Sequence, residues 1–220
     1  MVKTRTANKP TILILASGDP RRDRTDENPC QLAPIAGQPL LLYTLAQLKS
    51  RGHDTNVTVV THSMTIATAV PQYFYPEVHF YWAETVLSTR LLWTERTIIL
   101  HGDVIFSPTV LDAILAERAS IAFHGSMGEA FGIVFTTESH ARIRIALAKA
   151  IEDAPKDLPM RKGRGLVWQF YRAFNGTHLH KHVHNWNIYR LAPKDDYTCD
   201  IDHSIKKHTE FLEKYAWARS

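Results

Sequence analysis

The sequence predicts an α/β fold built on a doubly wound, mostly parallel sheet. Two observations lead to this prediction: short apolar segments rich in β-branched residues recur along the chain, and stretches with helical spacing separate them. This alternation is typical of parallel strands joined by crossover helices. The chain has 220 residues, 45% of them hydrophobic, which is enough for one substantial core but short for two. We therefore expect one domain over residues 1–220, with residues 137–190 forming a subdomain.

The strands are predicted where apolar β-formers run together. They lie at residues 11–16, 56–61, 78–82, 97–101, 120–124 and 131–136. Helical spacing between these segments predicts helices at residues 40–50, 64–70, 85–93 and 108–117. Pro108 suits the first turn of its helix, because the N–H group that proline lacks would have no partner there.

After Thr137 the alternation changes. A long helix is predicted at residues 139–153, followed by a connector with prolines and glycines between residues 155 and 165. A helix at residues 166–174, a turn at Asn175-Gly176, a strand at residues 179–189 and a closing helix at residues 204–215 complete the chain.

Composition excludes several classes of protein. No apolar segment approaches the ~20 residues that cross a bilayer, and the polar, basic start does not resemble a signal peptide, so we expect a cytoplasmic protein without membrane insertion.

Cys30 and Cys199 are the only cysteines, which excludes a disulfide framework and an all-cysteine zinc site. The formal charge of +4 suits a small anionic substrate as well as it suits nucleic acid. Because no repeat of aromatic and basic residues is present, nucleic acid is not the expected partner.

The end of the first strand carries a candidate phosphate-binding loop. Ala16, Ser17 and Gly18 are small enough for backbone N–H groups to approach an anion. Arg21 and Arg22 follow, and guanidinium groups bind phosphate oxygens in a fixed fork. The alternative is an ordinary turn at Gly-Asp-Pro. Ligands bind beyond the carboxyl ends of the strands in open parallel sheets, which favours the phosphate role.

Two carboxylate positions are candidate metal ligands. Asp103 follows a buried strand directly, and magnesium in proteins is typically held by one or two carboxylates together with phosphate oxygens and water. A helix-capping role for Asp103 is less favoured, because the next helix is predicted to begin several residues later. Asp202, in the segment Asp200-Ile201-Asp202, precedes the last predicted helix and by itself is better explained as its cap.

Read together, these segments resemble the nucleotidyltransferases that include sugar-1-phosphate nucleotidyltransferases and phosphocholine cytidylyltransferases. The most specific match is the string Pro-Cys-Gln-Leu-Ala-Pro-Ile-Ala-Gly-Gln-Pro-Leu at residues 29–40, where the family has a Pro-Lys-x-Leu segment and an Ile-x-Gly-x-Pro-Leu turn. Further matches are Gly102-Asp103-Val104, the segment Phe-Gly-Ile-Val-Phe at residues 131–135, and Asp200-Ile201-Asp202. The resemblance implies a Rossmann-like, nucleotide-diphospho-sugar transferase-like fold and a magnesium-dependent enzyme.

The resemblance also implies roles for individual residues. Asp103 and Asp202 become the two Mg²⁺ ligands, and with Arg21 and Arg22 they form the predicted catalytic set. The predicted nucleotide-binding residues are Ala16, Ser17, Gly18, Thr85 and Gly102, and the predicted acceptor-binding residues are Gly132, Arg161 and Lys162. Residues 137–190 are the corresponding acceptor-binding subdomain. The sequence departs from the family at Cys30, where the family has a lysine that neutralises the reacting phosphates, and the nearby arginines are the candidates to replace it.

The implied reaction joins a nucleoside triphosphate to a phosphorylated small acceptor and releases pyrophosphate. Two alternatives remain: a nucleotide-sugar-dependent glycosyltransferase, and a non-catalytic nucleotide-binding protein of the same fold. Alternating histidines at residues 178–184 share one face of a predicted strand and could hold zinc or copper, although a half-exposed structural strand is the preferred interpretation. The base, the acceptor and the oligomeric state do not follow from the sequence.

Overall fold

The computed structural model describes residues 9–16, 29–35, 37–78, 81–126, 129–154, 167–175, 187–194 and 196–201. Within these residues the strands of the main sheet follow the order β10-β8-β9-β6-β1-β4-β5. Their bounds are β1 (Thr11–Leu15), β4 (Val57–Val60), β5 (Tyr73–Phe74), β6 (Arg96–His101), β8 (Ile121–Gly125), β9 (Ala130–Thr136) and β10 (Tyr189–Leu191). β9 is antiparallel to β6 and β8, whereas the other neighbours in this sheet are parallel. The mostly parallel sheet expected from the sequence is confirmed.

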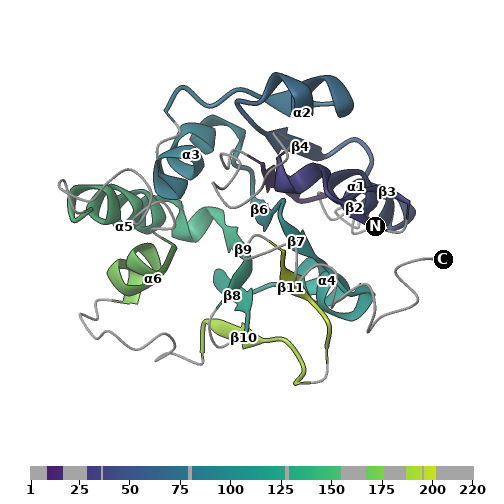
Figure 1. Cartoon of the computed structure of the whole chain (residues 1–220). Coiled ribbons are helices and arrows are strands. Elements are labelled where there is room, and N and C mark those ends of the chain that lie inside the picture. Colours follow the sequence, from purple (N-terminus) through teal and green to yellow (C-terminus); the bar gives the residue numbers. More distant parts are fainter. Residues whose placement is uncertain are drawn as a thin grey trace, which may run out of the picture.

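Helices cover both faces of this sheet. One side carries α1 (Leu40–Ser50) and α4 (Pro108–Ala116), and the other carries α3 (Trp82–Ser88), α5 (His140–Glu152) and α6 (Val167–Asn175), as Figure 1 shows. The helix α2 (Met64–Ala69) lies beside β4, and the short 3-10 helices are η1 (Cys30–Leu32), η2 (Thr89–Leu92) and η3 (Thr137–Ser139). None of the helices in the described segments is long and apolar enough to cross a membrane.

The sheet separates two apolar cores, because neighbouring side chains of a strand point to opposite faces. In β1, Ile12 and Ile14 are buried in the core that α1 and α4 cover. Leu13 and Leu15 are buried in the core that α3, α5 and α6 cover. A strand buried on both faces reads as a continuous apolar run, which explains why these strands could be located in the sequence.

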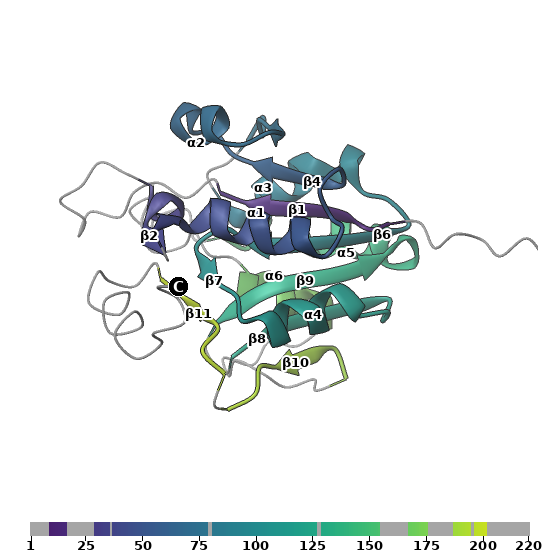
Figure 2. The same cartoon turned by 90° about the vertical axis from the view of Figure 1, so that its right-hand side faces the viewer.

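Two small sheets lie beyond the carboxyl ends of β1 and β6. One pairs β7 (Val104–Ile105) with β11 (Cys199–Asp200), and the other pairs β2 (Pro34–Ile35) with β3 (Gln38–Pro39). Gly37 has φ +78 in the turn between β2 and β3, a left-handed conformation that favours glycine. Figure 2 shows β2, β7 and β11 at the same end of the molecule. A third, smaller apolar cluster joins these pieces through Ile35, Ile105 and Ile201.

The predicted strand at residues 78–82 is wrong. Trp82 instead begins α3, and the Glu84 carboxylate accepts a hydrogen bond of 3.0 Å from the backbone N–H of Tyr81, which stabilises the first turn. The strand after α2 is β5, which the sequence analysis missed because it has two residues. Of the predicted strand at residues 179–189, only its end is described, and Tyr189 there begins β10. The predicted helix at residues 204–215 lies outside the described residues.

Candidate functional site

The candidate site lies where β1 and β6 end side by side. Leu15 pairs with His101 in the parallel ladder, and the backbone N–H of Gly102 continues it with a bond of 2.9 Å to the carbonyl of Leu15. Ala16 is fully buried, its N–H donates to Val60, and its carbonyl accepts from the Thr61 hydroxyl at 2.9 Å. These hydrogen bonds fix the positions of β1 and β6 at the point where each strand leaves the sheet.

Gly102 occupies a position without room for a side chain. A Cβ added there would lie 2.8 Å from the carbonyl oxygen of Leu15, 3.3 Å from the Cβ of Ala16 and 3.4 Å from the Cγ of Gln31. The Leu15 contact is with backbone, so it cannot be relieved by turning a side chain. Glycine is therefore needed here for close approach of the β1 and β6 ends.

Asp103 stands between β6 and β7 and is half-buried. Its backbone carbonyl accepts a hydrogen bond of 2.9 Å from the N–H of Ile201. The antiparallel register of β7 and β11, which places Asp200 opposite Val104, continues this contact. Ile201 is 1% exposed and packs beside Ile105, so the contact between the two segments is a buried one. The fold thus brings Asp103 next to the segment that leads into Asp202.

Two further predicted site residues lie on the surrounding elements. Thr85 is buried in α3, and its hydroxyl donates to the carbonyl of Tyr81 at 3.3 Å. Gly132 lies in β9 opposite Leu100, and a Cβ there would lie 2.9 Å from the carbonyl of Ile99. The nucleotide contact of Thr85 and the acceptor contact of Gly132 stay predictions.

Comparison with solved structures shows which fold this is. No known family model and no curated protein matches the sequence. The CTP:phosphocholine cytidylyltransferase from Streptococcus pneumoniae superposes with a TM-score of 0.63 at 12% identity, covering 94% of this chain and 99% of its own. The inositol-1-phosphate CTP transferase from T. maritima gives a TM-score of 0.57 at 13% identity, covering 94% and 96%. A cytidylyltransferase from Leptospira borgpetersenii gives 0.54 at 17% identity, covering 96% and 90%.

The chain has the nucleotidyltransferase fold. The fold that the motif resemblance implied is thereby confirmed over nearly the whole length of the chain. Within this fold, the paired ends of β1 and β6 and the contact between β7 and β11 lie around Gly102 and Asp103.

Several predicted site residues of this nucleotidyltransferase fold lie outside the described residues. They are Ser17, Gly18, Arg21, Arg22, Arg161, Lys162 and Asp202, together with the histidines at residues 178–184. The described residues nevertheless adjoin three of these segments. Ala16 precedes Ser17, Ile201 precedes Asp202, and Val167 follows the segment with Arg161 and Lys162. In the described segments, no group of three or more histidine, cysteine or acidic side chains could hold a metal ion.

Cys30 is the residue at which the motif resemblance implies a lysine in the family. It begins η1 and is 5% exposed, and the following residue, Gln31, is 1% exposed. The Cγ of Gln31 is one of the atoms that would crowd a side chain at Gly102, so η1 packs directly behind the β6 end. The Cys30 side chain is thus buried in η1, close to the end of β6.

The sequence analysis missed His101, the last residue of β6. The indole N–H of Trp82 donates to its Nε2 at 3.0 Å. Burial lowers the pKa of His101 to about 4, against a smaller opposite effect of a hydrogen bond to the backbone of Ala130. The ring is therefore neutral at pH 7 and its Nε2 can accept the bond. The position of His101 directly before Gly102-Asp103 was the signal available in the sequence.

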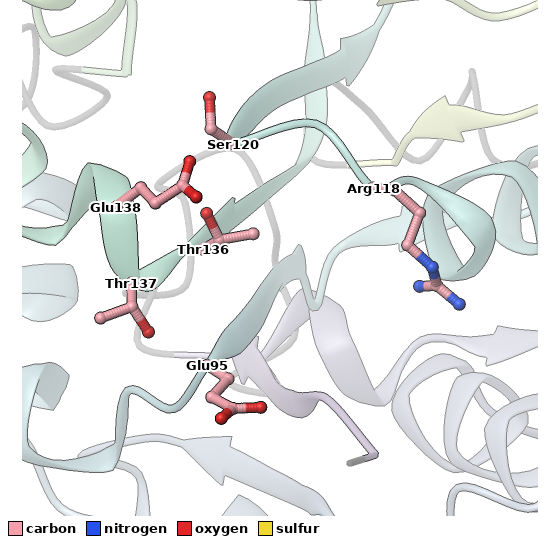
Figure 3. Close-up of a pocket in the computed structure, with 6 residues that line it drawn as sticks. All are labelled: Glu95, Arg118, Ser120, Thr136, Thr137 and Glu138. Carbon is pink, nitrogen blue, oxygen red and sulfur yellow. The ribbon is translucent and has the colours of Figure 1, made fainter. Parts of the chain in front are cut away.

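A separate hollow of about 490 Å³ lies at the other end of the sheet, where β6 and β8 begin. Figure 3 shows the side chains that line it: Glu95, Arg118, Ser120, Thr136, Thr137 and Glu138. Glu95 precedes β6 and Ser120 precedes β8, so the hollow lies where these parallel strands begin. It is therefore remote from Asp103 and forms no part of the candidate site.

Proposed function

We propose that this chain is a magnesium-dependent nucleotidyltransferase that joins a nucleoside triphosphate to a phosphorylated small acceptor, such as a sugar 1-phosphate, and releases pyrophosphate. The observation that carries the proposal is the contact of Asp103 with Ile201, which sets one predicted metal ligand beside the segment leading into the other. The three structural neighbours are named as transferases of CTP or cytidylyl groups, which supports the same class of reaction.

The residues of this site fit a magnesium ion. Magnesium is held in such sites by one or two carboxylates, with phosphate oxygens and water completing the coordination. Asp103 supplies one half-buried carboxylate at the end of β6, and Asp202 follows Ile201 directly in the sequence. When bound between Asp103 and Asp202, the metal would neutralise charge on the α-phosphate of the triphosphate.

In the proposed reaction, a phosphate oxygen of the acceptor attacks the α-phosphorus. The new P–O bond forms as the bond from the α-phosphorus to the bridging oxygen of the β-phosphate breaks, and pyrophosphate leaves with that oxygen. The protein supplies alignment and charge neutralisation rather than a covalent intermediate. Arg21 and Arg22, in the loop after Ala16, would hold the departing β- and γ-phosphates.

The acceptor is proposed to bind between β9 and the subdomain of residues 137–190. Gly132 is the predicted floor residue; it lies in β9 opposite Leu100, where a Cβ would meet the Ile99 carbonyl at 2.9 Å and the side chains of Leu100 and Ile114 at 3.2 and 3.6 Å. Arg161 and Lys162, in the segment that leads into α6, would bind the acceptor phosphate.

A release assay tests the proposal and separates it from its alternatives. The purified chain would be incubated with Mg²⁺, one of CTP, UTP, GTP, ATP or dTTP, and one of a series of phosphorylated acceptors, and the released phosphate species would be measured. Pyrophosphate release with one pair supports a nucleotidyltransferase. Release of a nucleoside diphosphate from a nucleotide sugar would instead indicate a glycosyltransferase, and triphosphate binding without turnover across the series would indicate a non-catalytic protein.

A further inference from the structure

A hydrogen bond between two aromatic side chains links β6, the strand that ends two residues before Asp103, to a neighbouring helix. The Nε1–H of Trp82 donates to the Nε2 of His101 at 3.0 Å. The ring centroids are 5.9 Å apart and the planes are inclined by 71°, so the indole meets the imidazole edge-on. An indole nitrogen can only donate, and so this bond requires an unprotonated Nε2.

The imidazole belongs to a part of the chain that cannot move easily. His101 pairs with Leu15 in the β1–β6 ladder, and the next residue, Gly102, donates to the same Leu15 carbonyl. Gly102 in turn leaves no room between the two strand ends. The acceptor nitrogen for Trp82 is therefore held at a fixed place two residues before Asp103.

The indole belongs to elements that lie over this strand end. Trp82 is the first residue of α3, and its ring packs on Phe170 of α6 at a centroid distance of 5.7 Å. Phe170 is 1% exposed and belongs to the core that α3, α5 and α6 share. The bond from Trp82 to His101 thus ties the beginning of α3 to the end of β6 before Asp103. Phe170 of α6 packs on the indole ring.

We propose that the Trp82–His101 hydrogen bond is a positioning contact that holds α3 against the Asp103 loop and thereby supports binding of the nucleoside triphosphate. The inference rests on the proposed function and on the predicted nucleotide contact of Thr85, which lies in α3. Neither side chain takes part in the chemical step. Both act through the place they give to α3 and to the end of β6.

Trp82→Phe removes the N–H donor and keeps most of the ring. Trp93→Phe is its matched control, because Trp93 donates a comparable bond of 3.1 Å from its Nε1 to Thr89, away from the end of β6. Binding of the magnesium complex of the triphosphate that the release assay identifies would be measured by calorimetry. We expect Trp82→Phe to weaken binding about three- to tenfold, the range of one ordinary hydrogen bond, and Trp93→Phe to change it less than twofold. Urea unfolding would report the loss of stability in each variant.

A second pair of variants tests the acceptor side of the bond. His101→Gln keeps a side-chain oxygen that can accept from Trp82, whereas His101→Leu keeps bulk and loses every acceptor. Triphosphate affinity should be close to wild type in His101→Gln and reduced in His101→Leu, with no further loss when Trp82→Phe is added to His101→Leu. Equal affinities in all these variants, with effects confined to unfolding, would overturn the positioning role and leave the proposed function intact. Absence of both triphosphate binding and turnover in the wild type would overturn the proposed function, and this role with it.

Discussion

Replacing Gly102 by alanine should disturb the candidate site more than it disturbs the fold. The added Cβ would lie 2.8 Å from the Leu15 carbonyl, about 0.6 Å short of the 3.4 Å at which ordinary contact begins. Forcing such a group into a packed site costs about 1–3 kcal/mol of stability. The strain can be relieved by moving the chain at residues 102–103, and a misplacement of about 1 Å in an active site lowers the rate about a hundredfold. We expect a loss of kcat/KM of at least about tenfold.

The assay is pyrophosphate release, with the free energy of unfolding measured in urea on the same samples. Gly52→Ala is the control: Gly52 has φ +79 with no atom within 4 Å of an added Cβ. Its substitution costs about 1–2 kcal/mol through the left-handed backbone alone, and it lies after α1 rather than at the end of β6. Wild-type turnover in Gly102→Ala, or an equal loss of turnover in Gly52→Ala, would refute the reasoning.

Two further predictions concern Cys30 and His124. Cys30→Ala should change turnover less than twofold, whereas Arg21→Ala should lower it about ten- to a hundredfold if that arginine replaces the family lysine, as steady-state kinetics would report; the reverse pattern would contradict this replacement. Burial lowers the pKa of His124 to about 4, opposed by Glu117. Because this pKa is lower than in the unfolded chain, the stability that the neutral ring contributes is present above pH 6.5 and is lost as the pH falls towards 4. Urea unfolding should show a loss of about 3 kcal/mol over this range that His124→Gln does not share, and parallel pH profiles of the two proteins would contradict the assignment.

Much of the fold could be predicted because its signals are local. The segment at residues 11–16 is apolar on both faces of the predicted strand, and the structure has β1 at Thr11–Leu15. The helix at residues 40–50 has the bounds that its spacing predicted. The prediction of a strand at residues 78–82 was wrong because it relied on the apolar character of Trp82. The carboxylate of Glu84, which caps the helix that begins at Trp82, was given too little weight.

The remaining features depend on contacts between distant residues. The pairing of β7 with β11, which supports the proposed role of Asp103, joins segments near the middle and the end of the chain. No local sequence pattern predicts this pairing. The bond from Trp82 to His101 likewise requires knowledge of where α3 lies over β6. The motif at residues 102–104 could be located in the sequence, whereas its surroundings required the tertiary structure.

The central claim is tested most directly by measuring Mg²⁺-dependent pyrophosphate release in Asp103→Asn and Asp202→Asn. Asp112→Asn is the control, because Asp112 is an exposed carboxylate on α4 that pairs with Arg51. We predict that both site variants lose turnover by at least about a hundredfold while their unfolding midpoints stay near that of the wild type, and that Asp112→Asn keeps wild-type turnover. Near-normal turnover in Asp202→Asn together with a lower unfolding midpoint would contradict the account and assign that residue to capping the last predicted helix.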